Sequence, residues 1–295
     1  MYGDKPEIVC FGEVLWDNLP HGCFPGGAPM NVAIHLFQLG LSSSIISRVG
    51  NDLLGEDIKE FIGKHGVSIA EIQDDKDHET GIVQADVTDP LNVKYDIKYP
   101  VAWDFIQFNE NAAKTIRASK IMVFGSLSVR NNASENALLK YLESAPYAVF
   151  DVNLRPPHFS ERRIKSLLSL ANFVKMNEEE LELIASWYGV SGEFERILER
   201  LSAVLNLEVI CVTLGDKGAI LYDSGEIYKH GGFVVEVVDT IGSGDSFLAA
   251  LLSKRLIHAD PQESLTFACA VGAFVASQAG ATPSIDIEEI NAMIR

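Results

Sequence analysis

The stretch Phe233-Val-Val-Glu-Val-Val-Asp-Thr-Ile-Gly-Ser-Gly-Asp-Ser-Phe-Leu-Ala-Ala-Leu-Leu252 carries the strongest fold signal in the chain. Its apolar first part predicts a strand that ends near Val238, and its last part predicts a helix that runs to about Arg255. In the turn between them, residues 239–244, two glycines flank one small residue. Such a turn can present successive backbone N–H groups to an anion at a helix N-terminus. A strand, a glycine turn and a helix in this order are typical of an α/β fold.

Asp245 opens the predicted helix directly after this turn. A carboxylate in this place could accept the proton of an attacking hydroxyl group. The N–H groups of Gly242, Ser243 and Gly244 would then hold the negative charge that develops on a transferred phosphoryl group. The alternative is that Asp245 only caps the helix, because Asp is a favoured N-cap residue. The length of the combined pattern favours the catalytic interpretation.

Short apolar runs alternate with helical patterns along most of the chain. We expect buried strands at residues 8–11, 45–49, 121–124, 148–152, 174–176 and 209–213. We expect helices at about residues 29–39, 54–65, 133–144, 162–172, 178–187 and 193–205. This alternation predicts a single α/β domain over residues 1–295, with a doubly wound, mostly parallel sheet that is flanked by helices.

One segment breaks the alternation and predicts an antiparallel hairpin, with arms at residues 82–87 and 93–99. In the second arm, Tyr95, Ile97 and Tyr99 alternate with polar residues, so we expect one face of the hairpin to be covered. An isolated hairpin is only marginally stable. We therefore interpret residues of about 10–23 and 80–104 as a small lid over an active site, and the alternative is an insertion without such a role.

Composition limits the class of partner. The chain of 295 residues has 24 basic and 41 acidic residues, a net charge of −17 at pH 7, which argues against nucleic acid and membrane surfaces as partners. The four cysteines are widely spaced without a CxxC pair, so we expect reduced thiols rather than disulfides or a zinc site. The N-terminus shows no basic segment followed by an apolar run, so we expect no signal peptide and a cytoplasmic location.

The turn Asp239-Thr-Ile-Gly-Ser-Gly-Asp245 resembles the DTxGAGD-type signature of the ribokinase, or PfkB, family of carbohydrate kinases, with Ser243 where Ala is usual. A second string, Phe24-Pro-Gly-Gly-Ala-Pro-Met-Asn-Val-Ala33, is similar to the GGxxxN sugar-binding element of that family. The resemblance extends from Gly12 to about Glu289. It implies a ribokinase-like fold and ATP-dependent phosphorylation of a sugar, with Asp245 as the catalytic base.

The resemblance also implies roles for further residues. The residues that it assigns to the sugar are Asp17, Gly26, Gly27 and Asn31. Those that it places beside the nucleotide are Asn177 and Glu180 of an NxxE motif, and Thr213, Gly215 and Gly218 of a TxGxxG turn. Gly272 lies with Ala268 and Ala276 in a stripe of small residues at helical spacing, which indicates close helix packing or, as the alternative, a wall that faces the adenine. Glu180 would hold Mg²⁺ through a water molecule, and Asp239 and Ile241, with residues 280–284, would bind a monovalent cation such as K⁺. Taken singly, each of these also has a structural explanation, such as a turn, a helix N-terminus or close helix packing.

Local strings at residues 12–17, 26–29, 102–104, 124–130 and 151–157 look most like fructokinases, which implies fructose as the substrate and fructose 6-phosphate as the product. Trp103 would pack over the sugar and Arg155 would reach one of its oxygens, although Arg155 could instead pair with Asp151 or another acid. Similar strings occur in 2-keto-3-deoxygluconate kinases, so that substrate remains open. A sugar-binding regulatory protein without catalysis is the alternative of another class, and a homodimer formed through the lid is the expected assembly.

Overall fold

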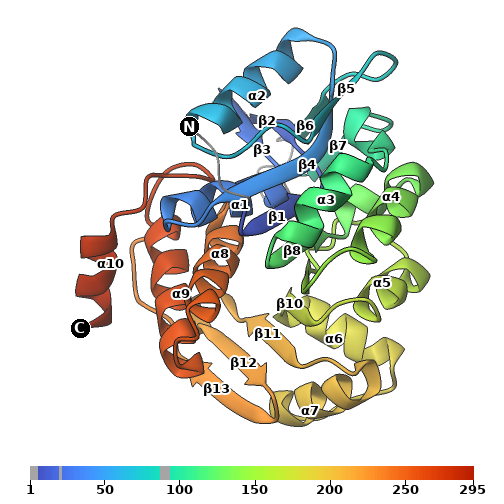
Figure 1. Ribbon diagram of the computed structural model, residues 1–295. Coiled ribbons are helices and arrows are strands. Elements are labelled where there is room, and N and C mark those ends of the chain that lie inside the picture. Colours follow the sequence, from blue (N-terminus) through green and yellow to red (C-terminus); the bar gives the residue numbers. More distant parts are fainter. Residues whose placement is uncertain (1–5, 20–21, 87–93) are drawn as a thin grey trace. The chain divides into compact units, whose positions relative to one another are not determined.

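The computed structural model describes residues 6–19, 22–86 and 94–295 (Figure 1). Its contacts divide the chain into two compact units, and we describe each by itself. The first unit consists of Met1–Phe37, Leu41–Met122 and Ser128–Pro146. The second unit consists of Gln38–Gly40, Val123–Leu127 and Tyr147–Arg295. The single domain over residues 1–295 stays a prediction.

The first unit contains three parallel strands, whose neighbours pair in the order β1–β4–β5. Their bounds are β1 (Ile8–Phe11), β4 (Ser43–Gly50) and β5 (Ile72–Asp75). The helices of this unit are α1 (Ala28–Gln38), α2 (Leu53–Lys64), α3 (Glu110–Ala118) and α4 (Asn132–Leu142), with short 3₁₀ turns η1 (Ala102–Phe105) and η2 (Leu127–Val129). The last residue of α1 and the first residue of η2 belong to the second unit. All four residues of β1 are fully buried, as its continuous apolar sequence predicts.

A second, small sheet in the first unit has the strand order β3–β2–β6–β7. Its strands are β2 (Leu15–Leu19), β3 (Gly22–Gly26), β6 (Gly81–Asp86) and β7 (Lys94–Ile97). The predicted hairpin is confirmed, because β6 and β7 pair antiparallel with Val83 opposite Ile97. Its turn lies outside the described residues. Ile97 is buried but Tyr99 is exposed, so the covered face ends earlier than the alternation predicts.

The second unit is built on a row of strands that pair in the order β9–β10–β11–β12–β13. The strands β9 (Ala148–Asp151), β10 (Phe173–Asn177) and β11 (Val209–Thr213) are parallel, whereas β12 (Ala219–Asp223) and β13 (Glu226–His230) are antiparallel. Strand β8 (Ile121–Gly125) has residues in both units. The predicted α/β class, with mostly parallel strands and helices between them, is confirmed.

Seven helical segments follow in the second unit. They are α5 (Glu161–Leu168), α6 (Glu178–Trp187), α7 (Phe194–Leu205), η3 (Gly215–Lys217), α8 (Ser243–Leu256), α9 (Pro261–Ala276) and α10 (Ile287–Ile294). Figure 1 shows α8 and α9 side by side, and α9 also contacts β12 and β13. In the part of the chain that the structure describes, no helix has both the length and the apolar character needed to cross a membrane.

The predicted strand before Val238 is wrong. The last strand of the chain is β13, and residues 231–242 form no strand. The backbone N–H groups of Val238 and Asp239 donate to the Ala276 carbonyl oxygen at the end of α9, at 2.9 and 3.2 Å, and not to a neighbouring strand. Val234 is fully exposed. The apolar residues of this segment therefore do not belong to a sheet, and four of the residues 233–237 line a pocket.

Candidate active site

The turn before α8 is held by one glycine and one carboxylate. Gly242 has a φ of 79°, which favours glycine, and a Cβ atom there would overlap with the Ala281 carbonyl oxygen. The Asp239 carboxylate accepts hydrogen bonds from the N–H groups of Ile241, at 2.9 Å, and Gly280, at 3.3 Å. Both Asp239 oxygens are thus engaged in fixing the turn, and the cation site at Asp239 and Ile241 stays a prediction.

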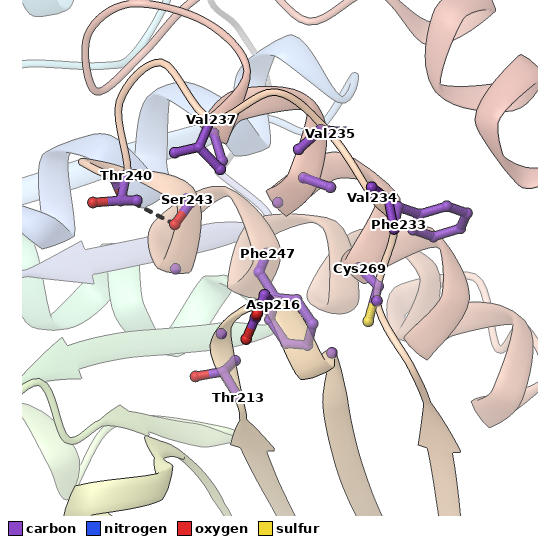
Figure 2. A pocket seen from close by; sticks show the side chains of 17 residues that line it. Thr213, Asp216, Phe233, Val234, Val235, Val237, Thr240, Ser243, Phe247 and Cys269 are labelled. Atoms are coloured by element: carbon purple, nitrogen blue, oxygen red, sulfur yellow. Dashed lines mark hydrogen bonds between the residues drawn. The ribbon is translucent and has the colours of Figure 1, made fainter.

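Two of the three predicted backbone donors of this turn have no acceptor within the described residues, namely the N–H groups of Gly242 and Gly244. The third, Ser243, donates its N–H to the Thr240 carbonyl oxygen at 3.3 Å, and its hydroxyl group donates to the same oxygen at 3.0 Å (Figure 2). Unpaired N–H groups and the helix dipole make a helix N-terminus attractive to anions. The turn can therefore hold an anion with the amides of Gly242 and Gly244.

A buried ammonium group lies beside this turn, which the sequence analysis missed. Lys175 is only 8% exposed, and its Nζ lies 3.0 and 3.2 Å from the two carboxylate oxygens of Asp151. Asp245, the third residue of α8, is half-buried, and its negative charge acts on Lys175 together with those of Asp151 and Glu180. Burial alone would lower the pKa of Lys175, but attraction to Asp151, Asp245 and Glu180 outweighs it and raises the pKa.

The predicted Asn177 and Glu180 form a capping box at the start of α6. The Asn177 side chain accepts the N–H of Glu180 at 2.8 Å, and Glu180 accepts the N–H of Asn177 at 2.8 Å and that of Leu154 at 2.7 Å. Burial raises the pKa of Glu180, against the lowering effect of these two hydrogen bonds. The structural explanation of this motif is therefore confirmed, and its role at a metal stays a prediction.

The fit to Mg²⁺ follows from the same contacts. Each Glu180 oxygen already accepts one N–H group, which leaves lone pairs for a water molecule. Among the described residues, no group of three or more His, Cys, Asp or Glu could enclose a metal ion. The residues present thus fit a hydrated ion that Glu180 contacts through water, and they do not form an all-protein metal cage.

A pocket of about 600 Å³ lies within the second unit and reaches the turn before α8. It brings together four of the residues predicted beside the nucleotide, Thr213, Gly215, Gly218 and Gly272, with Ser243 and Gly244. Phe233, Val234, Val235 and Val237 follow one another along the chain that passes over the pocket (Figure 2). Phe247, Ala273 and Ala276 add apolar surface. An apolar pocket that ends at a turn with available N–H groups suits a flat ring that carries phosphate groups.

In the first unit, the structure brings together the predicted sugar residues as two pairs. A Cβ atom on Gly26 would overlap with a carboxylate oxygen of Asp17 on the neighbouring strand, so Gly26 leaves room for that carboxylate. Gly27 has a φ of 116° and accepts the N–H of Asn31 at 2.9 Å in the first turn of α1. Asn31 is 4% exposed.

Trp103 does not lie where the sequence analysis expected it. Its ring is fully buried in the first unit, and the guanidinium group of Arg130 lies over it at 4.0 Å. Arg130 also forms a bidentate pair with the buried Asp104, with N–O distances of 2.7 and 2.9 Å. A Cβ atom on Gly81 would overlap with the indole nitrogen. Trp103 is therefore a core residue of the first unit, because both the ring and its Arg130 partner are enclosed, and the interpretation as a cover for the sugar is wrong for this structure.

Arg155 is exposed, and its guanidinium group donates to the carbonyl oxygen of the preceding Leu154 at 3.0 Å. The alternative, a pair with Asp151 or another acid, is wrong, because Arg155 forms no ion pair among the described residues and Asp151 pairs with Lys175. The Arg155 side chain thus keeps donors that can reach a ligand.

Comparison with solved structures defines the fold class. The fructokinase with bound ATP from Xylella fastidiosa has a TM-score of 0.86 at 22% identity, covering 99% of this chain and 98% of that chain, which shows a shared fold. The fructokinase from Vibrio cholerae O395 in a fructose, ADP and calcium ion bound form has a TM-score of 0.82 at 26% identity, covering 99% of this chain and 100% of that chain. The fold is thus that of ribokinase-like sugar kinases.

Sequence comparison identifies the family. Residues 6–288 match the model of the pfkB family carbohydrate kinases. Fructokinase-2 of Solanum habrochaites is 32% identical over 309 residues, which cover 94% of this chain and 92% of that protein. The chain belongs to the pfkB family of carbohydrate kinases. It is a carbohydrate kinase that resembles fructokinases.

Proposed function

We propose that this kinase transfers the γ-phosphoryl group of ATP to a primary hydroxyl group of fructose, which yields fructose 6-phosphate, with Asp245 as general base. The observation that carries the proposal is the continuity of the nucleotide-sized pocket with the turn that precedes Asp245. Ser243 and Gly244 line the pocket, and Asp245 is the next residue of the same helix. Groups that can bind the transferred phosphoryl group and a group that can accept the proton therefore lie within three consecutive residues.

In the proposed reaction, the Asp245 carboxylate takes the proton of the acceptor hydroxyl group as the oxygen attacks the γ-phosphorus. A bond forms between this oxygen and phosphorus, the bond from phosphorus to the bridging oxygen of ADP breaks, and ADP leaves with the electron pair. The N–H groups of Gly242 and Gly244 would hold the negative charge on the transferred group. Mg²⁺, when bound with ATP, neutralises phosphate charge, and Glu180 and Asn177 would support its water shell.

Several features support fructose as the sugar. The Solanum relative is a fructokinase, and the Vibrio cholerae relative is described in a fructose-bound form. We propose that Asp17 and Asn31 bind sugar hydroxyl groups, that Gly26 and Gly27 allow the sugar to approach the backbone, and that Arg155 reaches a further oxygen. Carboxylate and amide groups that pair with hydroxyl groups discriminate strongly against analogues that lack them.

Four further statements belong to the same proposal. The small sheet of the first unit acts as a lid, and it also forms a homodimer contact. A monovalent cation such as K⁺ binds near Asp239 and Ile241. The cytoplasmic location, which the four unbridged cysteines favour, stays a prediction.

The test is ADP release with ATP and Mg²⁺ over a panel of fructose, 2-keto-3-deoxygluconate, ribose, tagatose and adenosine. We expect fructose to give the highest kcat/KM and the product to carry its phosphate on a primary carbon by ³¹P NMR. A higher kcat/KM with 2-keto-3-deoxygluconate would overturn the choice of fructose but leave a sugar kinase. Fructose binding by calorimetry without ADP release from any panel member would instead support the regulatory alternative.

A further inference from the structure

Lys175 is a charged residue in the middle of a buried strand, and the mechanism described so far does not use it. Three residues of β10, Phe173, Val174 and Met176, are fully buried, and Lys175 is nearly so. Burial of an ammonium group is strongly unfavourable unless the group is paired and hydrogen-bonded. A charge retained at such a position needs a physical reason.

The strand register accounts for one part of that reason. Lys175 lies directly beside Asp151 of β9 and beside Cys211 of β11 in the parallel pairs. Because neighbouring residues in register point to the same face of a sheet, the three side chains form a row on one face. Asp151 holds Lys175 through both of its oxygens. This pair alone would be complete as a buried ion pair.

The turn before Asp245 accounts for the other part. Gly244 is not among the glycines with positive φ, so its backbone does not require glycine. A Cβ atom there would lie 3.2 Å from the Nζ atom of Lys175, closer than neighbouring atoms usually approach a Cβ. The ammonium group thus lies directly against the residue before Asp245, in the space that a side chain at position 244 would take. Its location fits an action on the turn as well as on Asp151.

We propose that Lys175 is a positioning residue for the catalytic base: its ammonium group, fixed by Asp151, lies beneath the Gly244–Asp245 peptide and holds the Asp245 carboxylate ionised and oriented. The proposal rests on the proposed function, since it requires Asp245 to be the base. In the proposed reaction, Lys175 contacts neither the sugar nor the phosphate groups.

The charges around Lys175 show why its removal should affect the ionisation of the Asp245 carboxyl group. The groups that act on it are Asp151 of β9, Glu180 of α6 and Asp245 of α8, and the Cys211 thiol of β11 lies beside it. The cluster therefore holds one cation against three carboxyl groups. Burial raises the pKa of Cys211, so the thiol stays neutral. Without Lys175, the three carboxyl groups would have no cation of this cluster beside them, and like charges that are close together favour the protonated form of a carboxyl group. A protonated carboxyl group cannot act as the base.

The experiment compares Lys175→Met, the double variant Lys175→Met/Asp151→Asn, and the control Lys229→Met, which removes an exposed lysine that pairs with Glu195. The measurements are urea unfolding and kcat/KM for fructose as a function of pH. In Lys175→Met, we expect the acid limb of kcat/KM to move up by about 1 pH unit or more, the scale on which a nearby opposite charge acts. The double variant restores charge balance, so its unfolding should return toward wild type, because neutral replacement of a buried pair is often tolerated.

The double variant decides between the two roles. If Lys175 also acts on Asp245, the double variant folds well but keeps a raised acid limb, between those of wild type and Lys175→Met. If Lys175 only balances Asp151, the double variant regains both the stability and the wild-type pH profile, and the inference is overturned. An unmoved acid limb with a raised KM for ATP would also overturn it, because Lys175 would then act on the nucleotide.

Failure of this inference is distinguishable from failure of the proposed function. An Asp245→Asn variant that keeps its turnover removes the base, and the role of Lys175 with it. An inactive Asp245→Asn variant, together with a wild-type pH profile in the double variant, removes only the role of Lys175. The Lys229→Met control should match wild type within about twofold in kcat/KM, since an exposed ion pair contributes little.

Discussion

Replacement of Gly242 by alanine tests whether the turn before α8 has to keep its shape for catalysis. The φ of 79° at this residue costs a non-glycine residue about 1–2 kcal/mol. The new methyl group would also overlap with the Ala281 carbonyl oxygen, and such overpacking costs about 1–3 kcal/mol when the neighbour has to move. The free energy of unfolding should therefore fall by about 2–5 kcal/mol.

The effect on turnover should exceed the effect on substrate binding. Gly242 supplies one of the two available N–H groups of the turn. Alanine keeps this N–H group, but the overlap with Ala281 and the unfavourable φ would move it out of position. Loss of one such donor contact lowers kcat by about 10²- to 10³-fold in enzymes that use them. We expect a kcat of about 1% of wild type or less, with the fructose KM within about threefold. The assays are coupled ADP release and urea unfolding.

The matched control is Gly63→Ala. Gly63 lies in α2, and a Cβ atom there meets no other atom within 4 Å. Alanine should stabilise this helix by about 0.5–1 kcal/mol and leave kcat unchanged. A Gly242→Ala enzyme with a kcat within twofold of wild type and the same unfolding midpoint would refute the reasoning on the turn.

Three further predictions concern other parts of the chain. Burial acts to raise the pKa of Asp52, but hydrogen bonds from Thr80 and Gly55 outweigh it and hold this pKa below its usual value. The stability that the carboxylate contributes is therefore present above a pH of about 4 and is lost as the pH falls through the folded-state pKa. Asp52→Asn should lower the free energy of unfolding in urea by about 1–3 kcal/mol at pH 7 and by progressively less below a pH of about 4. Trp103→Ala should cost about 3–5 kcal/mol in the same assay, because it empties a fully buried site; a loss below 1 kcal/mol would contradict its place in the core. Arg155→Ala should raise the fructose KM about tenfold or more and leave unfolding within about 0.5 kcal/mol, because the side chain is exposed; an unchanged KM would remove Arg155 from the sugar site.

Elements with a strong local signal could be predicted closely from sequence. The bounds of β1, β11 and α6 agree with the expected residues, since each is a continuous apolar run or begins at a clear N-cap. The end of α5 at Leu168 falls four residues before the expected end, because Ser169 already caps the helix. Local signals define where an element exists better than where it ends.

Residues 233–238 show where local signals fail. Valine-rich runs are typical of buried strands, but these valines border a pocket, and their backbone bonds to α9 come from a tertiary contact that periodicity does not contain. Strand β13 lacks a continuous apolar pattern, with exposed or half-exposed residues along it, and was missed for that reason. Strand β12 does have a short apolar run, Ala219-Ile-Leu-Tyr222, and this signal was missed.

The residues of the candidate site also fall into those that a local sequence pattern indicates and those that only a tertiary contact brings into the site. Gly242, Gly244, Thr213 and Gly215 could be named because glycines and small residues in turns leave a local pattern. Lys175 could not, since its partner Asp151 lies 24 residues away and meets it only through strand pairing. The one available signal was a lysine within an apolar run of strand length. The burial of Trp103 could not be predicted either, because it depends on Arg130, which lies on another segment of the chain. The sequence analysis therefore placed Trp103 over the sugar.

The most direct test of the central claim is the turnover of Asp245→Asn, measured by ADP release with fructose beside its unfolding midpoint and its affinity for ATP. We predict a loss of kcat of about 10²-fold or more with ATP affinity within about threefold of wild type, the scale for removal of a general base. The unfolding free energy should change by less than about 1 kcal/mol, because Asp245 is half-buried and Lys175 keeps its pair with Asp151 when the charge of Asp245 is removed. A folded Asp245→Asn enzyme with a kcat close to wild type would contradict the assignment of Asp245 as the base.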